Sequence, residues 1–300
     1  MKILLTGGNG YLGSYIRKIL KKNNEIFTLS RSSSEYNCNL ALETPKFNDQ
    51  FDLIIHSAAK AHSIPVNEIE NDEFFSVNVG GTFNLLEGLK LASLPKHFVF
   101  ISSVSVYGII EGVNIKEESP LLAEDAYGKS KIDAEAIVQQ WCDSHNVICT
   151  ILRLPLVVGE NPPGNLGAMI RGIKKGYYFN IAGGNAKKSM VLASDIAKFI
   201  LKAAEVGGTY NLTDGIHPTF NELSNNISRQ FSKSFVPNMP LFIANVLAKI
   251  GDILGNTFPI NSNKLSKITS TLTFDDSKAR AAFGWNPTPV LESFKLLENA

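Results

Sequence analysis

Tyr127 and Lys131 are the side chains of this sequence best placed by spacing to move a proton. They stand four residues apart at the start of a predicted helix that runs through Trp141, so they share one helix face. An ammonium close to a phenol favours the phenolate, and we expect it to lower the pKa of Tyr127 from about 10 toward neutral pH. Such a pair can give and take a proton at a substrate oxygen. The spacing alone is common on helix surfaces, so the chemistry needs support elsewhere in the chain.

A second chemical signal lies at the start of the chain, where glycines follow an apolar run. Residues 2–6 predict a strand, Gly7, Gly10 and Gly13 follow it, and apolar residues at helical intervals begin at Leu12. Glycine permits a tight turn, close approach of backbone to a pyrophosphate, and close packing of helix on strand. Backbone N–H groups and the positive end of the helix dipole then bind the anion. The order strand, glycine turn, helix therefore predicts a dinucleotide site.

The end of the second predicted strand, residues 25–30, bears on which dinucleotide binds. An acidic residue about 20 positions beyond the glycines binds the ribose 2′-hydroxyl, whereas an arginine there accommodates a 2′-phosphate. Ser30 occupies the acidic position and Arg31 follows it. We therefore expect NADP, with NAD as the alternative if Arg31 is a solvated residue of a serine-rich turn.

The remaining strands and helices alternate along the chain. A helical pattern over 68–91 contains the pair Gly80-Gly81, which costs helix stability and so suggests close approach by another group. Further strand patterns occupy residues 52–57, 97–103, 147–154 and 208–213. This alternation predicts an α/β fold with a Rossmann-type, doubly wound parallel sheet.

Later helical patterns predict a smaller C-terminal substrate lobe. They lie at residues 220–231, 241–254 and 290–297. We assign residues 1–160 plus about 190–218 to the dinucleotide-binding domain, and about 161–189 plus 219–300 to the lobe.

Composition and charge narrow the partners of this 300-residue chain. It is 44% apolar, enough for a large core, and its 29 basic and 28 acidic residues give a net charge of +1. From this balance we expect no nucleic-acid partner and no membrane partner, but a substrate recognised locally. The most apolar late segment, Leu241 to Leu254, is too short to span a bilayer. It carries Asn245, Lys249 and Asp252 at helical intervals, which predicts an amphipathic helix of the fold.

Other reactive side chains give weaker signals. Cys38, Cys142 and Cys149 have neither metal-ligand nor disulfide spacing, so we expect no bound metal. An odd cysteine count in a chain without a signal peptide before Lys2 predicts a cytoplasmic protein. His56 lies on an apolar strand beside alanines, which favours a structural role.

Six motifs, spread over nearly the whole chain, follow the order of one known family. They are T-G-G-x-G-x-L-G at Thr6–Gly13, H-x-A-A at His56–Ala59, N-V-x-G-T at Asn78–Thr82, S-S-x-x-V-Y-G at Ser102–Gly108, Y-G-x-S-K at Tyr127–Lys131 and F-G-W-x-P at Phe283–Pro287. On these motifs the sequence resembles the extended short-chain dehydrogenase/reductase family, which includes the nucleotide-sugar epimerases and dehydratases. Six matches in order are much more specific than any one of them.

The resemblance implies a role for each of the strongest residues. Tyr127 would be the acid/base, Lys131 would bind the nicotinamide ribose and tune Tyr127, and Ser103 would hydrogen-bond the reacting sugar oxygen. The physical argument agrees, because hydride reaches or leaves a ring carbon only if the attached oxygen exchanges a proton at the same time.

The resemblance also implies a larger set of binding residues. With the glycine loop included, the candidate cofactor-binding residues are Gly7, Gly10, Tyr11, Leu12, Gly13, Arg31, Asn39, Leu40, Ala58, Ala59, Asn78, Ser102, Tyr127, Lys131 and Pro155. The candidate residues for binding a nucleotide-diphosphate sugar are Ser103, Ser105, Tyr127, Asn165, Leu166, Phe179 and Lys188.

Departures from the family pattern narrow the reaction. Dehydratases of this family carry Asp-Glu after the catalytic hydroxyl residue, where this chain has Val104-Ser105, and neither exchanges protons near neutral pH. Leu156 stands where the epimerases usually have Asn, and their Arg-Pro-Gly-Asp run is missing. The stretches 152–159 and 272–278 look more like enzymes of surface-polysaccharide pathways, which epimerise or reduce at C4 of a nucleotide-linked sugar.

The resemblance leaves two activities open. In a 4-keto reductase, Tyr127 would protonate the carbonyl oxygen as NADPH delivers hydride, and Arg31 favours this reading. In a 4-epimerase, hydride would leave C4 and return to the other face, so NAD could stay bound. The alternatives are a reductase of a non-sugar ketone and a non-catalytic NADP-sensing regulator, which would have little reason to keep Tyr127, Lys131 and Ser103 together. We expect a homodimer that pairs the helices at 78–91 and 127–141 across a two-fold axis.

Overall fold

The computed structural model describes residues 1–61, 68–255 and 260–296, and a parallel sheet organises them. Within these ranges the central sheet has seven strands in the order β11-β7-β5-β4-β1-β2-β3. The strands are β1 (Lys2–Thr6), β2 (Glu25–Ser30), β3 (Tyr36–Asn37), β4 (Leu53–His56), β5 (His97–Ser103), β7 (Ile148–Leu154) and β11 (Gly208–Asn211). This order confirms the predicted α/β, doubly wound fold, because the chain runs outward in both directions from β1 and β4. In such sheets ligands bind where the order reverses, at the carboxyl ends of the strands.

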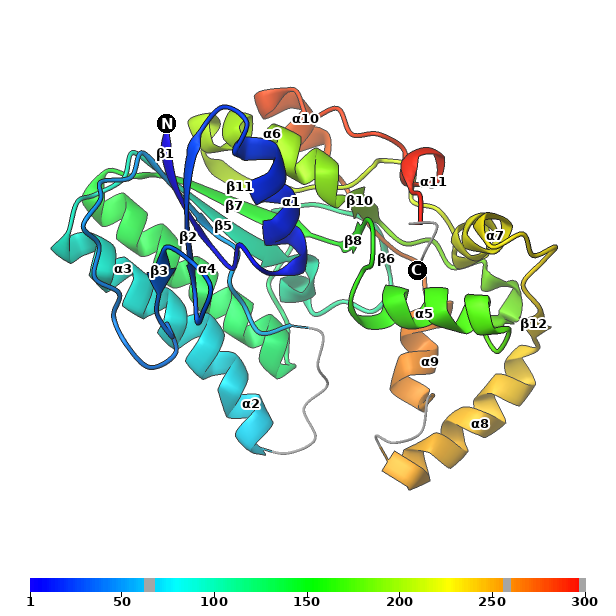
Figure 1. Cartoon of the computed structure of the whole chain (residues 1–300). Coiled ribbons are helices and arrows are strands. Elements are labelled where there is room, and N and C mark those ends of the chain that lie inside the picture. Colours follow the sequence, from blue (N-terminus) through cyan, green and yellow to red (C-terminus); the bar gives the residue numbers. More distant parts are fainter. Residues whose placement is uncertain (62–67, 256–259, 297–300) are drawn as a thin grey trace.

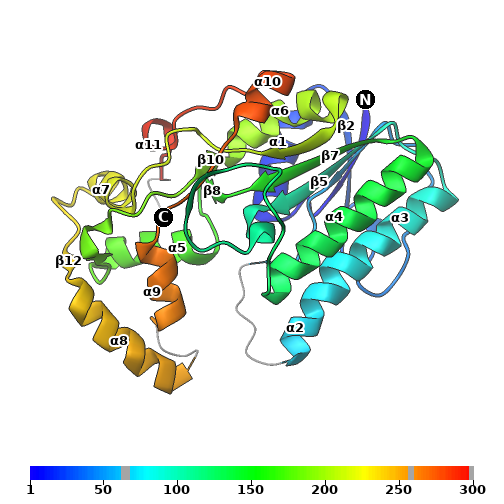
Figure 2. The ribbon, with the colours of Figure 1, turned by 180° about the vertical axis from the view of Figure 1, so that it is seen from behind.

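Helices cover both faces of the sheet (Figures 1 and 2). The helices α1 (Tyr11–Leu20) and α6 (Ala193–Val206) lie on one face, and α3 (Gly81–Leu91) and α4 (Ala126–His145) lie on the other. Alternation along β1 sends Ile3 and Leu5 into the first core and Leu4 into the second. Because both faces are covered, the strands are apolar throughout rather than alternating with polar residues.

The helical segment before β5 contains a π-helical turn. The helix α2 (Glu68–Phe75) continues through η1 (Ser76–Gly80) into α3. A Cβ at Gly81 would contact the Leu40 side chain at 3.4 Å, and one at Gly88 would lie 2.6 Å from the Pro45 carbonyl oxygen. At Gly80 the nearest atom would be 3.9 Å away. The close approach expected at the glycine pair is therefore made at Gly81 by the chain's own 40–45 segment.

The smaller lobe is built from helices and two-stranded pairs. Its helices are α5 (Gly164–Lys175), α7 (Phe220–Gln230), α8 (Leu241–Leu254), α9 (Ser262–Thr269) and α11 (Val290–Ser293). The short parallel pairs are β8 (Leu156–Val158) with β10 (Met190–Leu192), β9 (Asn180–Ile181) with β12 (Asn238–Met239), and β6 (Gly112–Ile115) with β13 (Leu272–Phe274). The strands β6, β8 and β10 fall within the ranges that the sequence assigns to the dinucleotide-binding domain, but β8 and β10 pack into the core of the lobe with α5 and α7. The helix expected over 290–297 ends at Ser293, and residue 297 lies outside the described residues. In the described part of the chain, no helix is both long and apolar enough to span a bilayer.

One late segment packs away from the lobe to which the sequence assigns it. The helix α10 (Ser277–Phe283) contacts α6 and β11, and its Ala279 and Phe283 join the core of the dinucleotide domain together with Trp285. The Trp285 indole N–H donates to the Thr213 carbonyl at 2.9 Å. Residues 277–285 therefore belong structurally to the dinucleotide domain, because their apolar side chains complete its core.

The packing of α3 generates a test of the fold. Gly88→Ala should lower the free energy of unfolding by about 1–3 kcal/mol, because its Cβ meets a backbone carbonyl that cannot move aside freely. Gly80→Ala is the matched control on the same helical segment, and it should leave stability unchanged or raise it by up to about 1 kcal/mol. Urea unfolding of both variants measures the difference. Equal effects would contradict the packing described.

Candidate active site

The glycine loop between β1 and α1 leaves no room for side chains at two positions. Gly7 has φ +67°, and a Cβ there would lie 2.7 Å from the backbone nitrogen of Ala58. A Cβ on Gly13 would lie 2.1 Å from the Gly7 carbonyl oxygen. The backbone N–H of Gly10 donates to that same carbonyl at 2.8 Å. The loop is therefore held tightly between α1 and the end of β4, which brings Ala58 against it.

The amino end of α1 fits the pyrophosphate of a dinucleotide. Gly10 is the N-cap residue, and among the described residues no side chain caps the helix. The free N–H groups of the first turn and the helix dipole therefore face the loop that glycine keeps open. The residues present fit a nicotinamide dinucleotide in donor type and in space, and Gly7, Gly10, Tyr11, Leu12 and Gly13 are the residues that would surround its phosphates.

Tyr127 and Ser103 meet at the carboxyl end of β5. Ser103 is the last residue of β5, and its hydroxyl accepts a hydrogen bond from the backbone N–H of Ser105 at 3.1 Å. Tyr127 lies in the first turn of α4, where Asp125 caps the helix by accepting from the N–H of Gly128. The Ser103 side chain lies beside the Tyr127 phenol and favours its ionised form, and the Phe74 ring packs edge-on against the phenol with the ring centroids 6.0 Å apart. Two hydroxyls therefore converge where a substrate oxygen can bind both.

The structure corrects the expected effect of Lys131 on Tyr127. Burial raises the pKa of Tyr127; the Ser103 side chain opposes this rise and the Asp125 carboxylate adds to it. The Lys131 ammonium instead donates to the Ile101 carbonyl at 2.6 Å and lies 4.1 Å from the centre of the Phe100 ring. Burial lowers the pKa of Lys131 to about 7, against the pull of Glu135. The shared helix face is real, but the Lys131 head group is bound to β5 rather than directed at the phenol.

Beneath Ser103 and Lys131 lies a buried ion pair that the sequence analysis missed. Arg153 on β7 donates to both carboxylate oxygens of Glu135 on α4, with the shortest contact 2.7 Å. The Ser102 hydroxyl donates to the same carboxylate. Both charged side chains are less than 8% exposed. The sequence did contain a signal for this pair. Glu135 stands one helical turn beyond Lys131, and a carboxylate on a helix face that is buried requires a charged or hydrogen-bonding partner.

The Arg153 guanidinium also reaches two loops. Its other end donates to the Tyr107 hydroxyl at 3.1 Å and to the Glu117 carbonyl at 3.0 Å. Tyr107 in turn donates to the side chain of Asn211 on β11 at 2.8 Å, and the Asn211 backbone N–H donates to the Glu117 carboxylate. Arg153 therefore connects α4, β5, β7 and β11 directly below the site.

His56 and Asn78 hold the other side of the site together. The Ala58 N–H donates to Thr6 Oγ1, so the Thr6 hydroxyl donates to His56 Nδ1 at 2.6 Å. The Thr82 hydroxyl donates to the Asn78 carbonyl, so His56 Nε2–H donates to Thr82 at 2.9 Å. Burial lowers the pKa of His56 to about 3, which keeps the imidazole neutral in this chain of hydrogen bonds. This arrangement supports the structural role expected for His56.

The Asn78 side chain links the strand-end loop to α4. It accepts from the Lys60 N–H at 2.7 Å and donates to the Lys60 carbonyl and to the Ser130 hydroxyl. Ser130 donates in turn to the Tyr127 carbonyl at 2.8 Å. Asn78 is 2% exposed, so its side chain acts here by placing Tyr127 and the loop that contains Ala58 and Ala59.

The remaining cofactor candidates lie along the same edge of the sheet. Arg31 is exposed just beyond β2, while Asn39 and the buried Leu40 lie in the loop beyond β3. Pro155 separates β7 from β8. The Tyr11 hydroxyl has no hydrogen-bond partner among the described residues.

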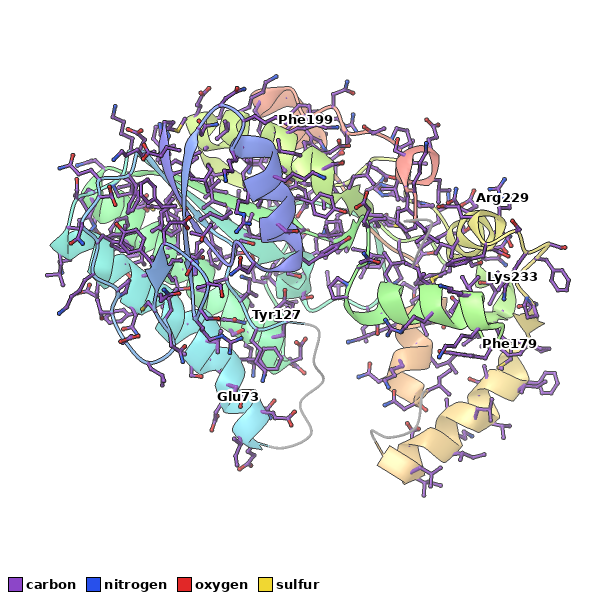
Figure 3. The ribbon with its side chains drawn as sticks, viewed as in Figure 1. Glu73, Tyr127, Phe179, Phe199, Arg229 and Lys233 are labelled. Atoms are coloured by element: carbon purple, nitrogen blue, oxygen red, sulfur yellow. The ribbon has the colours of Figure 1, made fainter. Side chains whose placement is uncertain are left out.

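The substrate candidates of the lobe are spread along α5. Asn165 is exposed in the first turn, and Phe179 follows the end of this 12-residue helix, which is about 18 Å long. Figure 3 shows Tyr127 on the dinucleotide domain and Phe179 on the lobe. Leu166 is buried in the lobe core, so its side chain serves packing. Lys188 is partly buried, and burial together with Lys267 lowers its pKa to about 8.

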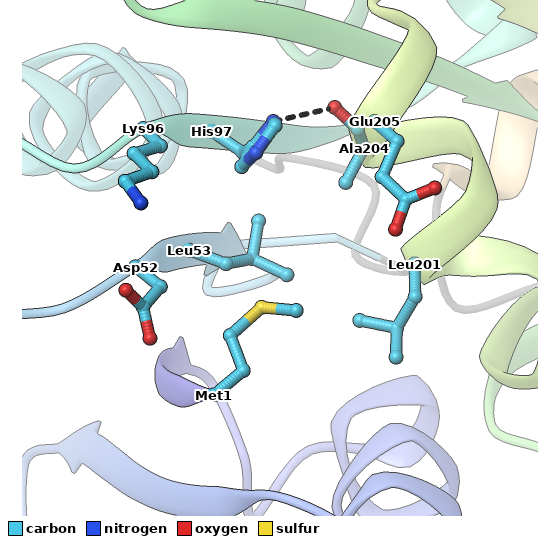
Figure 4. Close-up of a pocket in the computed structure, with 8 residues that line it drawn as sticks. All are labelled: Met1, Asp52, Leu53, Lys96, His97, Leu201, Ala204 and Glu205. Carbon is cyan, nitrogen blue, oxygen red and sulfur yellow. Dashed lines mark hydrogen bonds between the residues drawn. The ribbon is translucent and has the colours of Figure 1, made fainter.

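A surface pocket at the opposite edge of the sheet has no part in this site (Figure 4). It lies at the amino ends of β1, β4 and β5, lined by Met1, Asp52, Lys96 and His97 among others. The seven residues of β5 place His97 roughly 20 Å from Ser103. In the described residues no cluster of side chains could hold a metal ion.

Comparison with known proteins gives one family. The sequence model described as "NAD dependent epimerase/dehydratase family" matches residues 3–213. The chain is 26% identical over 303 residues to the N-acetyl-alpha-D-glucosaminyl-diphospho-ditrans,octacis-undecaprenol 4-epimerase of Escherichia coli O157:H7, covering 93% of this chain and 89% of that protein. It is 26% identical over 314 residues to the UDP-glucose 4-epimerase of Vibrio cholerae, covering 98% and 93%.

Solved structures support the fold. The UDP-glucose 4-epimerase of Thermotoga maritima, solved with UDP-glucose, matches with a TM-score of 0.76 and 20% identity, covering 97% of this chain and 95% of that one.

The ion pair below the site predicts a strong coupling. Glu135→Gln should lower the free energy of unfolding by about 3–5 kcal/mol, because it leaves the Arg153 guanidinium buried without its counter-ion. The double variant Glu135→Leu/Arg153→Met should lose much less than the sum of the two single changes. Urea unfolding of the two single variants and the double variant measures the coupling. Additive losses would show that the pair does not act as a unit.

The burial of Lys131 predicts a pH dependence of stability. Between about pH 7 and pH 10.5, the two pKa values of folded and unfolded Lys131, the unfolded chain binds one more proton. The free energy of unfolding should therefore rise with pH in this window by up to roughly 1 kcal/mol per pH unit, and Lys131→Met should remove that rise. Urea unfolding of cofactor-depleted protein at pH 7 and pH 9 measures it. Exposed Lys129→Met is the control, and equal slopes in all three proteins would contradict the argument.

Proposed function

Because the chain belongs to the NAD dependent epimerase/dehydratase family and is an enzyme of it, we propose that it is a 4-epimerase of a hexose or N-acetylhexosamine carried on a diphosphate. The observation that supports this most directly is the convergence of Tyr127 and Ser103 at the end of β5, beside the dinucleotide loop. The relatives named 4-epimerases support the reacting position. Their carriers differ, one a nucleotide and the other a polyprenol, and both present a diphosphate.

The chemistry assigns a task to each side chain. A bound nicotinamide supplies the hydride acceptor and donor for the sugar carbon. Ser103 donates to or accepts from the sugar oxygen and so orients it toward the Tyr127 hydroxyl. Tyr127 takes the proton of that oxygen when the carbon is oxidised and returns it when the carbon is reduced. Lys131 shares the helix face of Tyr127, and its side chain is held by the Ile101 carbonyl on β5, two residues before Ser103.

The neighbours of Ser103 support epimerisation or reduction rather than dehydration. Val104 and Ser105 follow Ser103 in the short helical turn η2 (Val104–Tyr107), and the Ser105 hydroxyl lies 3.1 Å from that of Ser103. Neither side chain has an acid or base strength suited to removing a proton from carbon near neutral pH.

A 4-keto reductase is the second candidate, and the end of β2 favours it. Ser30 and Arg31 leave this strand end without the acidic residue that selects NAD. The nearby Glu35 carboxylate is committed to Thr28, whose N–H and hydroxyl donate to it at 2.8 and 2.6 Å. On this basis we propose NADP as the cofactor if the chain is a reductase, with NAD as the alternative that an epimerase would retain. A regulator without catalysis, or a reductase of a non-sugar ketone, has no such supporting observation.

Two further properties are part of the proposal. We infer a homodimer through α3 and α4, supported by Phe83, which is 53% exposed on α3. We also infer a cytoplasmic location, supported by the three free and buried cysteines.

The proposed function is tested by activity and by the cofactor that purifies with the protein. Tyr127→Phe should lower turnover of UDP-glucose, UDP-N-acetylglucosamine or a polyprenyl-diphosphate N-acetylglucosamine by about 10²–10⁴-fold, because it removes the acid/base hydroxyl. Dinucleotide binding should persist. Tyr210→Phe is the control, since the Tyr210 hydroxyl donates to the carbonyl of Gly207, the residue just before β11, and so lies outside the proposed site.

The released cofactor separates the two candidates. Near-stoichiometric NAD from the denatured protein would support the epimerase and would return Arg31 to a surface role. An empty site that prefers NADPH would support the reductase, with 4-keto sugars as substrates. No turnover of any sugar diphosphate by the wild-type protein would contradict both.

A further inference from the structure

The helix α8 (Leu241–Leu254) turns its large apolar side chains away from the protein. Successive residues of a helix are 100° apart, which places five large apolar side chains of α8 within one arc of about 100°. This apolar arc consists of Phe242, Ile243, Val246, Ile250 and Ile253. They are exposed by 70, 39, 57, 41 and 86%. The opposite face, which packs on the lobe, consists of small residues instead.

Only that small-residue face joins the core of the lobe. Ala244, Ala248 and Gly251 are buried against α9, where Leu265 completes the cluster. Figures 1 and 2 show α8 as an outlying helix at the lower end of the lobe. The sequence predicts an amphipathic helix of the fold, and the structure confirms the helix. The five residues of the apolar arc, however, belong to no buried core cluster of the described residues.

We propose that the apolar arc of α8 docks on the surface of an anionic lipid bilayer. A helix with an apolar face, a separate polar face and flanking lysines lies in the interface between headgroups and acyl chains. This proposal replaces the expectation of no membrane partner, which treats the segment as part of the core.

The positive charge next to the apolar arc favours an anionic lipid surface over a neutral one. Lys249 borders the arc on α8, whereas Lys264 and Lys267 lie on α9, which packs on the opposite face of α8. The one carboxylate within 241–269, Asp252, accepts hydrogen bonds from the N–H and hydroxyl of Ser262. This tip is therefore more basic than the chain as a whole, whose net charge is +1. A lysine beside an apolar face, as Lys249 is, extends its ammonium group to lipid phosphates while its stem stays in the apolar layer.

A second copy of the chain fits the arc less well. The five side chains expose on the order of 500 Å², below the ~800 Å² per partner of a standard interface. A two-fold contact through α8 would also bring the lysines of both copies together, which repels, whereas anionic lipid neutralises them.

Docking through α8 has a consequence for the site. The helices α2 and α8 both reach the lower end of the molecule (Figure 1), and Tyr127 lies above α2 on the dinucleotide domain (Figure 3). A bilayer on α8 would then bring the site close to diphosphates carried on membrane lipids. This consequence rests on the proposed function, whereas the docking surface stands on α8 itself.

Vesicle sedimentation of the purified full-length protein tests the proposal. Wild-type protein should pellet with vesicles of phosphatidylglycerol and phosphatidylcholine and stay largely soluble with phosphatidylcholine alone. Phe242→Glu/Ile253→Glu should abolish pelleting, and Val206→Glu, which changes an exposed apolar residue on α6, should leave it unchanged. Lys249→Gln, which keeps the apolar arc, should weaken binding by roughly fivefold.

Three results would overturn the proposal. The first is wild-type protein that stays soluble with anionic vesicles. The second is a Phe242→Glu/Ile253→Glu variant that pellets with these vesicles as much as the wild type does. A wild-type dimer that this variant converts to monomers, measured by light scattering, would assign the arc to self-association. Turnover of soluble UDP-sugars by the same variant, compared with wild type, reports on the reaction separately, so failure of the enzymatic proposal leaves the vesicle result interpretable.

Discussion

A buried ion pair between Glu135 and Arg153 fixes the floor of the candidate active site. Two charges this deep are tolerated only because nearly every donor and acceptor around them is matched. The carboxylate accepts a hydrogen bond from the Ser102 hydroxyl, and the guanidinium donates to the Tyr107 hydroxyl and to the Glu117 carbonyl. The end of β5, the first turns of α4 and the β6 region therefore cannot shift independently. This rigidity holds Ser103 and Tyr127 within reach of one substrate oxygen.

The dinucleotide side of the site depends on the absence of side chains in the glycine loop rather than on charge. Gly7 and Gly13 bring two backbone segments so close that no Cβ fits, and Ala58 closes the loop from β4. The neutral hydrogen-bond chain through His56 and Thr82 then carries this arrangement to Asn78 and so to α4. Both halves of the site meet at the first turns of α4, which explains why the Tyr127 segment is central to the fold as well as to the chemistry.

The lobe is packed differently from the sheet domain. Its elements are short, and its main core is shared among α5, α7 and the strand pair β8 and β10. The helix α8 adds little to that core, because only small residues face inward.

The sequence by itself determined the sheet, the glycine loop and the Tyr127–Lys131 helix, because each rests on local periodicity and spacing. Only the tertiary structure decided which groups the buried charged side chains contact. Whether Lys131 faces Tyr127 or the Ile101 carbonyl, and whether Glu135 meets Arg153, depends on strands far apart in sequence. The same holds for residues 277–285, which return to the first core, and for α8, whose apolar residues give the same helical pattern whether they face inward or outward. Periodicity reports that a helix has an apolar face, and only packing reports what that face contacts.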